Sequence, residues 1–339
     1  MAYITLNKKH FFNNLNIIAQ LSKDKDKIAL VLKDNAYGHG LREMAKMAQQ
    51  YGITRAVVRS YAEAKDIEDF FEYVLILADT PQHNNAKFRY TINDLAAIKK
   101  FPKGTKVELK VNTGMNRNGI EMDELREAFE AVQKGALELE AVFTHHSSAD
   151  EDETIFTQQN EKFASVKEEV KKLQKRFGMQ KLRFHSCNSA ALFQTENFSE
   201  DMVRVGIAAY GCLELPENKE AQRLKPVLSL YANKISSRRL REGDCVGYGA
   251  SYKAADACTV TNYDFGYGDG FLRSCSHHYS TPEGRELLGR ISMDNSSFLA
   301  NEEALLIFND ARVVAQSAGT ISYEVLTALK EKLPRRILE

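Results

Sequence analysis

The sequence predicts an α/β protein with an N-terminal (β/α)8 barrel of the TIM type, followed by a mainly β C-terminal domain. Two observations lead to this prediction. Between residues 29 and 206, short apolar segments alternate with amphipathic helical segments roughly eight times, and eight parallel strands close a barrel. After Pro226, strand-like segments follow one another with few helical patterns between them. A chain of 339 residues is long enough for both parts.

The barrel elements follow from the periodicity of the apolar residues. A first helix is expected over Lys8–Leu21, with Asn7 as its N-cap. Strands are expected at Ala29–Leu32, Arg55–Arg59, Val74–Ala78, Phe88–Tyr90, Lys106–Val111, Leu139–Thr144, Leu182–His185 and Val203–Val205. The intervening helices are expected at Leu41–Tyr51, Ala62–Phe71, Asn93–Lys100, Glu124–Lys134, Glu153–Phe177 and Ser189–Glu196.

The second domain is expected to consist mostly of strands. These are predicted at Val227–Ile235, Cys245–Tyr252, Ala257–Phe265, Leu287–Ile291 and Ala311–Ala315, and only Tyr323–Leu333 has a helical pattern. We therefore assign residues 8–225 to the barrel, and residues 1–7 together with 226–339 to the β domain.

Composition excludes several classes of protein. Lysine plus arginine and aspartate plus glutamate both number 46, so no basic surface for nucleic acid is indicated. No apolar stretch reaches membrane-spanning length, and the first residues do not resemble a signal peptide. The five cysteines lack CxxC spacing, and His277 and His278 lack a carboxylate pattern, so no metal site is expected. A cytoplasmic protein without nucleic-acid or membrane partners is predicted.

Lys33 is the first candidate for chemistry. It directly follows the apolar segment Ile28–Leu32, and a buried strand seldom ends in lysine because desolvating an ammonium is costly. A lysine in such a position is suited to forming a Schiff base. Taken alone, it is better explained as a solvated side chain. Polar residues also end or follow other barrel strands, where barrel active sites lie: Lys110, Arg117, His145, His146, His185, Asn188, Ser189 and Arg204.

A phosphate site is expected beside the last barrel strand. The backbone N–H groups of Gly206 and Ile207, with the Ser189 hydroxyl, can hold a phosphate without a lysine or a metal. A Schiff-base lysine, this phosphate site and Arg204 in one barrel mouth together indicate pyridoxal phosphate as the cofactor.

The chain closely resembles the alanine racemase family, whose members join a barrel to a β domain. The resemblance runs nearly from end to end. It rests on ordered motifs at Val31–Gly40, Lys110–Ile120, Asn188–Ala190, Arg204–Gly211, Gly247–Ala250, Gly266–Gly270, Gly289–Asp294 and Ile321–Glu324. Asp34, Asn112, Gly268 and Ser292 depart from residues common in the family, and none of them is a named catalytic group.

The resemblance implies two catalytic bases on opposite faces of the substrate. Lys33 would carry the cofactor and act as one base, and Tyr248 from a partner subunit's β domain would act as the other. Arg117 and the partner's Met293 backbone would bind the substrate carboxylate, and Tyr267 would line the entrance. Taken alone, Tyr248 is more simply explained as a packed aromatic residue in a glycine-rich strand.

The resemblance also implies the contacts of the cofactor. Arg204 would hydrogen-bond the pyridine nitrogen, and His145 and His185 would orient Arg204. Without the resemblance, both histidines are equally well explained as core residues. The phosphate would be held by Tyr37, Ser189, the backbone of Gly206 and Ile207, and Tyr323.

The activity that the resemblance implies is the interconversion of L- and D-alanine by a homodimer with shared active sites, supplying D-alanine for peptidoglycan. Three alternatives stay open: a decarboxylase of the same fold, a racemase of broader specificity and a non-catalytic pyridoxal-phosphate carrier. Decarboxylases of this fold usually place an acidic residue at the pyridine nitrogen, where this chain offers Arg204. Carriers are single barrels, so the segment from Leu228 onward argues against that alternative.

Overall fold

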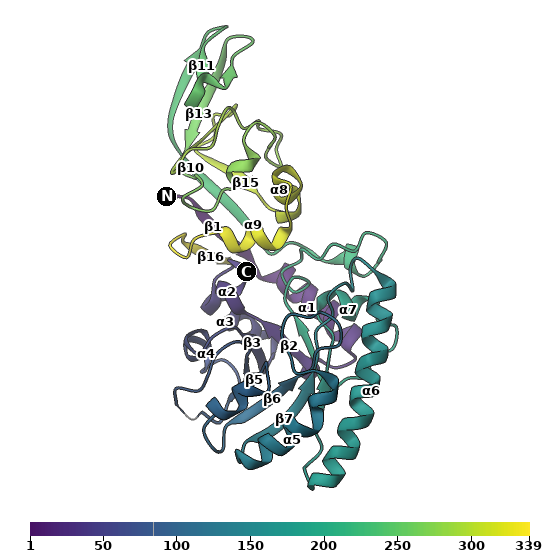
Figure 1. The fold of residues 1–339 in the computed structure, drawn as a ribbon. Helices are drawn as coiled ribbons and strands as arrows, with labels where there is room; N and C mark the ends of the chain where they lie inside the picture. The colour runs from purple at the N-terminus through teal and green to yellow at the C-terminus, as the bar shows by residue number, and fades with distance from the viewer. Residues whose placement is uncertain (84) are drawn as a thin grey trace.

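The computed structural model describes residues 1–83 and 85–339. Within those residues, eight parallel strands form one sheet in the order β9-β2-β3-β4-β5-β6-β7-β8, which confirms the predicted barrel (Figure 1). The strands are β2 (Ile28–Val31), β3 (Arg55–Val58), β4 (Tyr73–Ile76), β5 (Phe88–Ile92), β6 (Lys106–Lys110), β7 (Glu138–Phe143), β8 (Arg183–His185) and β9 (Val203–Val205).

The two end strands of this sheet, β8 and β9, approach each other and nearly close the barrel. The Asp201 backbone N–H donates to the Phe184 carbonyl at 3.1 Å, and the Arg204 N–H donates to the Cys187 carbonyl at 3.0 Å. Two main-chain hydrogen bonds therefore replace a regular ladder at the seam, and they place Arg204 next to the residues that follow β8.

Helices cover the outside of the barrel, except that the short α2 (Lys33–Tyr37) lies at the barrel mouth next to the β domain (Figure 1). They are α1 (Lys8–Ser22), α2 (Lys33–Tyr37), α3 (Leu41–Tyr51), α4 (Tyr61–Ile67), α5 (Leu125–Lys134), α6 (Glu153–Phe177) and α7 (Ser189–Gln194). The α3 and α6 ranges match the prediction, whereas the helix expected at Asn93–Lys100 is only a 3₁₀ turn at Ala96–Lys100. None of the helices within the described residues is long and apolar enough to cross a membrane.

The C-terminal sheet has the order β14-β13-β10-β1-β16, and β15 also pairs with β10. The N-terminal strand β1 lies between β10 and β16, so both ends of the chain belong to this sheet. Its elements are β1 (Tyr3–Asn7), β10 (Leu228–Leu240), β13 (Cys258–Tyr263), β14 (Ser296–Phe298), β15 (Ala304–Phe308) and β16 (Arg335–Leu338), and the hairpin β11 (Cys245–Val246) with β12 (Tyr252–Lys253) extends from it (Figure 1).

Three predictions for this domain are wrong. Cys245–Tyr252 was expected to be a single strand, but the chain turns back at Tyr248–Ala250, so β11 and β12 form a hairpin. Ala311–Ala315 was expected to be a strand, but Ala311–Ala318 forms the helix α8. The Asp310 side chain caps it by accepting from the Arg312 N–H, and the buried residues Ala311, Val314 and Ala315 follow the helical period, which outweighs the strand preference of the valines. The strand expected at Leu287–Ile291 is reduced to an isolated bridge between Leu287 and Phe298.

The β domain packs against the barrel beside α2. Its helix α9 (Ser322–Ala328) contacts α2, and the Arg335 guanidinium donates to the Gly38 carbonyl at 2.9 Å. The contact at Gly38 is so close that a Cβ atom there would lie 2.0 Å from the Leu326 carbonyl oxygen. The segment that follows the first barrel strand is therefore held between the two domains.

Candidate active site

Most of the residues expected at the site line one cavity of about 480 Å³ at the carboxyl ends of the barrel strands. These are Lys33, Tyr37, Arg117, His145, Ser189, Arg204, Gly206, Ile207 and Tyr323. Within the described chain, Tyr248, Tyr267 and Met293 do not line it. Because Tyr323 belongs to α9, the cavity is built by the barrel and by the β domain of the same chain.

The turn that carries Lys33 has an unusual backbone. From Asp34 to Ala36 it is left-handed, with φ and ψ of 54° and 53° at Asp34, 55° and 43° at Asn35, and 52° and 48° at Ala36. L-residues avoid this region because the Cβ atom crowds the next carbonyl, at a cost of about 1–2 kcal/mol per residue. The sequence indicated a turn into a helix here, but it gave no sign of the hand of the turn.

Hydrogen bonds from neighbouring segments hold this strained turn. The Glu63 carboxylate accepts from the Asp34 N–H at 2.7 Å and from the Arg59 N–H at 2.7 Å. The Asn35 side-chain oxygen accepts from the Leu41 N–H at 2.8 Å, at the start of α3. Strain that the surroundings maintain is concentrated at functional sites, which supports a functional role for the turn that carries Lys33.

Arg204 is buried on β9, and nearly all of its guanidinium donors are hydrogen-bonded to other residues. Its Nη2 donates to the carbonyls of Thr144 at 2.7 Å and Ser186 at 3.0 Å, and its Nη1 hydrogen-bonds Nδ1 of His185. Among the described residues, no protein acceptor is found for its Nε–H. Burial lowers the pKa of Arg204, but a guanidinium keeps its proton in proteins. Arg204 therefore brings one unused, permanently protonated donor to the cavity.

His145 lies beside this guanidinium, with its Nδ1 3.4 Å from Nη2 of Arg204. Desolvation, together with the charges of Arg204 and Lys110, holds the pKa of His145 well below its ordinary value. His145 is therefore neutral and presents a nitrogen lone pair to Arg204, which is consistent with an orienting role.

The expected phosphate site is a cluster of donors around Ser189. Its Oγ accepts from the backbone N–H groups of Gly206 at 3.1 Å and Ala208 at 3.3 Å. Tyr37 packs against Gly206 so closely that a Cβ atom there would lie 2.9 Å from the Tyr37 hydroxyl. Burial raises the pKa values of Tyr37 and Tyr323, so both hydroxyls remain protonated donors.

The residues of this cavity fit pyridoxal phosphate. The cofactor needs an amine, donors for its phosphate and a partner for its pyridine nitrogen. Lys33 offers the amine, and the Ser189 cluster with the two tyrosine hydroxyls offers the phosphate donors. The unused Nε–H of Arg204 offers a donor to a nitrogen lone pair. The donor set is therefore complete within one chain.

Lys110, at the end of β6, adds another cation to this cavity. Burial, followed by the charges of Arg204 and Arg117, lowers the pKa of Lys110 to about 8. With Lys33, the cavity is thus lined by several cations and by one carboxylate, that of Asp34, among the described residues. Such a charge distribution favours anionic ligands, including a phosphate and a carboxylate.

The three predicted β-domain residues lie on the surface of the chain. Tyr248 is 68% exposed, Met293 56% and Tyr267 42%. Backbone hydrogen bonds tie two of their loops together, because the Tyr267 N–H donates to the Ser292 carbonyl at 3.0 Å and the Gly268 N–H to the Met293 carbonyl at 2.7 Å. The single chain therefore does not bring these residues to Lys33.

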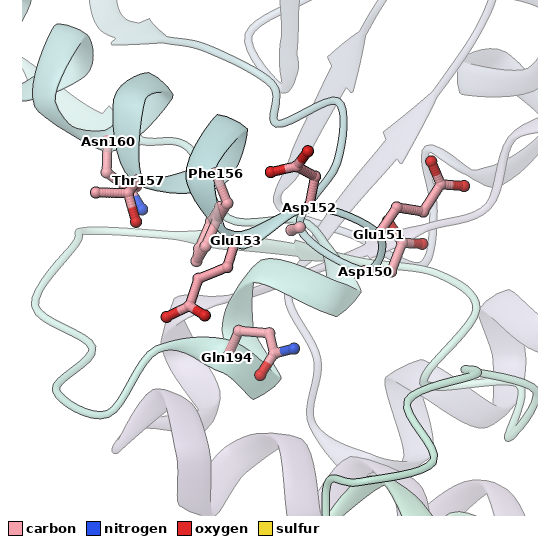
Figure 2. A pocket seen from close by; sticks show the side chains of 9 residues that line it. Asp150, Glu151, Asp152, Glu153, Phe156, Thr157, Asn160 and Gln194 are labelled. Carbon is pink, nitrogen blue, oxygen red and sulfur yellow. The ribbon is translucent and has the colours of Figure 1, made fainter.

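A second hollow, of about 440 Å³, lies beside the start of α6 (Figure 2). Its lining includes four consecutive acidic residues, Asp150 to Glu153, and none of the residues predicted for the site. No group of three or more potential metal ligands is found within the described residues. This hollow lacks the cations that a phosphate or carboxylate ligand would require.

A barrel with a lysine at its mouth and an attached β domain places the protein in the class of barrel enzymes that take a small-molecule substrate at the strand ends. The family follows from sequence comparison. The family model described as "Alanine racemase, N-terminal domain" matches residues 6–214, and "Alanine racemase, C-terminal domain" matches residues 227–337. The chain therefore belongs to the alanine racemase family.

Full-length relatives and solved structures agree with this assignment. A protein named alanine racemase from a Nitratiruptor species is 45% identical over 335 residues, which cover 99% of both chains. Another, from Campylobacter concisus, is 42% identical over the whole of both chains. The alanine racemase structure from E. faecalis has a TM-score of 0.85 at 26% identity, covering 99% of this chain and 98% of that one. The structure from Bacillus anthracis, with bound L-Ala-P, has a TM-score of 0.84 at 26% identity, covering 100% and 95%.

Proposed function

We propose that this chain interconverts L- and D-alanine, with pyridoxal phosphate bound at Lys33, as a homodimer. The D-alanine formed would serve peptidoglycan synthesis. The observation that carries the proposal is the buried Arg204, which lines the cavity together with Lys33 and whose Nε–H has no acceptor among the described residues. An acidic residue in that place would favour a decarboxylase, because it would keep the pyridine nitrogen protonated and strengthen electron withdrawal.

When bound, pyridoxal phosphate withdraws electrons from the α-carbon of the amino acid and so acidifies its α-proton. Lys33 Nζ removes or returns this proton on one face of the substrate. Tyr248 Oη of the second copy does so on the other face. Racemisation requires this arrangement, because the proton must leave from one side and a proton must arrive from the opposite side.

Other residues of the cavity position the reactants. Arg117 lines the cavity and binds the substrate carboxylate, helped by the Met293 N–H of the second copy. Arg204 would hold the pyridine nitrogen of the cofactor through its Nε–H and, because a guanidinium keeps its proton, would leave that nitrogen unprotonated, which would limit electron withdrawal and disfavour side reactions. The protonated hydroxyls of Tyr37 and Tyr323 donate to the phosphate.

A second copy is proposed because the site is incomplete without it. Tyr248, Tyr267 and Met293 are large, exposed residues of the β domain, and backbone hydrogen bonds hold the loops of Tyr267 and Met293 together. A C₂ dimer would place the β domain of each copy over the barrel mouth of the other, so that both sites are completed by the same interface.

The test is a circular dichroism assay with L-alanine, L-serine or L-lysine, with and without added pyridoxal phosphate. We expect cofactor-dependent loss of the L-alanine signal and borohydride trapping of the cofactor on Lys33. The serine arm measures substrate breadth, since one extra hydroxyl is weakly discriminated in a permissive pocket. Carbon dioxide release from L-lysine would establish the decarboxylase instead. Bound cofactor without exchange of any α-proton would establish a carrier.

A further inference from the structure

The barrel interior beneath the cavity contains a fully buried carboxylate, that of Glu108 on β6. Glu108 and Lys110 are two residues apart on the strand, so both point to the same face, with Glu108 one layer deeper. Barrel interiors are ordinarily filled by branched apolar side chains. A buried carboxylate is costly unless it is fully hydrogen-bonded, so its partners indicate what it does.

Glu108 has three close partners from two other strands. Its Oε1 accepts from the Tyr73 hydroxyl at 2.6 Å and from Nη2 of Arg183 at 2.9 Å. Its Oε2 lies 2.9 Å from Nε2 of His185. Burial acts to raise the pKa of Glu108, but the hydrogen bonds from His185 and Tyr73 and the charge of Arg183 hold the pKa below its ordinary value. The carboxylate is therefore ionised and can only accept hydrogen bonds.

The partners of His185 permit one protonation state. Because ionised Glu108 has no proton to donate, His185 must donate from Nε2. The other ring nitrogen, Nδ1, faces Nη1 of Arg204, which is donor-only, so Nδ1 must carry a lone pair. An imidazolium would bring two donors face to face. Desolvation lowers the pKa of His185, in agreement with the neutral ring.

Packing prevents the His185 ring from turning out of this arrangement. Phe143 stacks on it with ring centroids 4.6 Å apart and planes inclined by 12°. The Arg204 guanidinium also lies against Phe143, 5.0 Å from its ring centroid. His185 and Arg204 are thus fixed against the same aromatic side chain, and a change at either is transmitted to the other.

We propose that Glu108 is a positioning residue that holds His185 as its Nε2–H tautomer, and thereby holds Arg204 with its Nε–H directed to the cavity. The tautomer part stands on the geometry alone; the consequence for catalysis rests on the proposed function. Glu108 fixes the proton of His185, His185 accepts from Nη1 of Arg204, and the carbonyls of Thr144 and Ser186 hold Nη2. Among the described residues, the guanidinium donor left without a protein acceptor is the Nε–H.

Glu108→Gln would change the hydrogen bonds from position 108 to His185 while keeping a side chain of nearly the same shape. Its carbonyl would turn toward the Arg183 charge, which places its NH₂ group against Nε2 of His185. His185 would then have to accept at Nε2 and carry its proton on Nδ1, facing Arg204. Tyr73→Phe is the matched control, because it removes a hydrogen bond from the same carboxylate but leaves the acceptor of His185 in place.

The test is ¹⁵N NMR of the full chain with labelled histidine, recorded without added cofactor, with His185 assigned by the loss of its signals in His185→Asn. We expect the Nε2–H tautomer in the wild type and in Tyr73→Phe, and the Nδ1–H tautomer in Glu108→Gln. An Nδ1–H tautomer or an imidazolium in the wild type would overturn the proposal, even if Glu108→Gln fails to fold. An unchanged tautomer in a folded Glu108→Gln would overturn it as well.

A kinetic readout then tests the consequence for Arg204. Residues that orient a metal-binding histidine are worth about 10–100-fold, and we expect an effect of the same order from Glu108. With cofactor, we expect kcat of Glu108→Gln to fall by at least about tenfold at little-changed KM, and Tyr73→Phe to stay within about threefold of the wild type. If Glu108→Gln has the altered His185 tautomer but keeps the wild-type kcat, the tautomer of His185 does not position Arg204 for catalysis. The NMR experiment does not require turnover, so it tests the tautomer of His185 independently of the proposed function.

Discussion

The two halves of the site are built in opposite ways. In the barrel half, Arg204 is buried and its guanidinium is held by Thr144, Ser186 and His185. In the β-domain half, Tyr248 is 68% exposed and does not line the cavity. The barrel half is a preformed binding site, whereas the β-domain half is a surface.

This difference separates two functions. Cofactor binding needs rigid donors at fixed places, and these come from several barrel strands and from α9 of the β domain of the same chain. The proposed second base must reach the face of the substrate opposite Lys33, and Tyr248 does not line the cavity of its own chain. A surface residue that another copy inserts can supply this base. We therefore expect cofactor binding to be local to one chain and racemisation to require two chains.

The largest effect on activity is expected from Tyr248→Phe. This substitution removes the Tyr248 hydroxyl and leaves the barrel half of the site unchanged. General acid–base groups contribute about 10²–10⁴-fold, so kcat should fall within that range while pyridoxal phosphate stays bound. Loss of α-deuterium from one enantiomer of alanine should suffer far more than from the other. Tyr252→Phe, four residues away, is the control and should retain activity. Equal loss of exchange from both enantiomers would contradict the two-base assignment.

A second prediction concerns the contact that joins the halves within one chain. Gly38→Ala should lower the free energy of unfolding by about 3–5 kcal/mol, because the new Cβ atom would lie 2.0 Å from the Leu326 carbonyl oxygen. Gly104→Ala is the matched control, since Gly104 also has a positive φ but nothing within 4 Å. It should cost only about 1–2 kcal/mol of backbone strain. Urea unfolding of both variants measures the difference, and equal losses would show that the domain contact is unimportant.

A smaller effect is expected at His146, a buried barrel residue whose ring nitrogens both lack partners among the described residues. Burial lowers the pKa of His146 to about 4 from an ordinary value of 6.5. Between these values the unfolded chain binds the proton and the folded chain does not, so stability falls as pH falls from about 6.5 to 4.

His146→Phe removes this proton uptake. The free energy of unfolding of the wild type should therefore decline relative to the variant over that pH range, by about 3 kcal/mol. Above pH 7 the difference between the two proteins should be constant. If the stability curves of the two proteins stay parallel down to pH 4, His146 takes up no extra proton on unfolding. That result would contradict the prediction that burial in the barrel keeps His146 neutral.

Much of the fold was accessible from the sequence because barrel strands and helices obey simple periods. The ranges Leu41–Tyr51 and Glu153–Phe177 are helices as predicted. The β domain was less accessible. Its strands β14, β15 and β16 gave no clear period, and the valines of Ala311–Ala315 masked a capped helix. There, tertiary contacts decide the structure more than local preference does.

The site shows the same division. Strand ends and a glycine motif placed Lys33, Ser189 and Arg204 near one another, because a barrel brings all its carboxyl ends to one mouth. The left-handed backbone at Asp34 could not be foreseen, since the Glu63 carboxylate, far outside the motif, helps to stabilise it. Glu108 had a usable signal, its position two residues before Lys110 on a strand, but its partner His185 is far away in the sequence.

The claim that each site is shared between two copies is tested most directly by mixing two inactive variants. Lys33→Ala and Tyr248→Phe chains are purified separately, dissociated, mixed in equal amounts and allowed to reassociate with cofactor, and racemisation of L-alanine is measured. A mixed dimer carries one site with both native bases. Random reassociation makes half of the dimers mixed, so activity should return to about one quarter of the wild-type value. No recovery above the two separate variants, in a mixture shown to contain mixed dimers, would contradict the account.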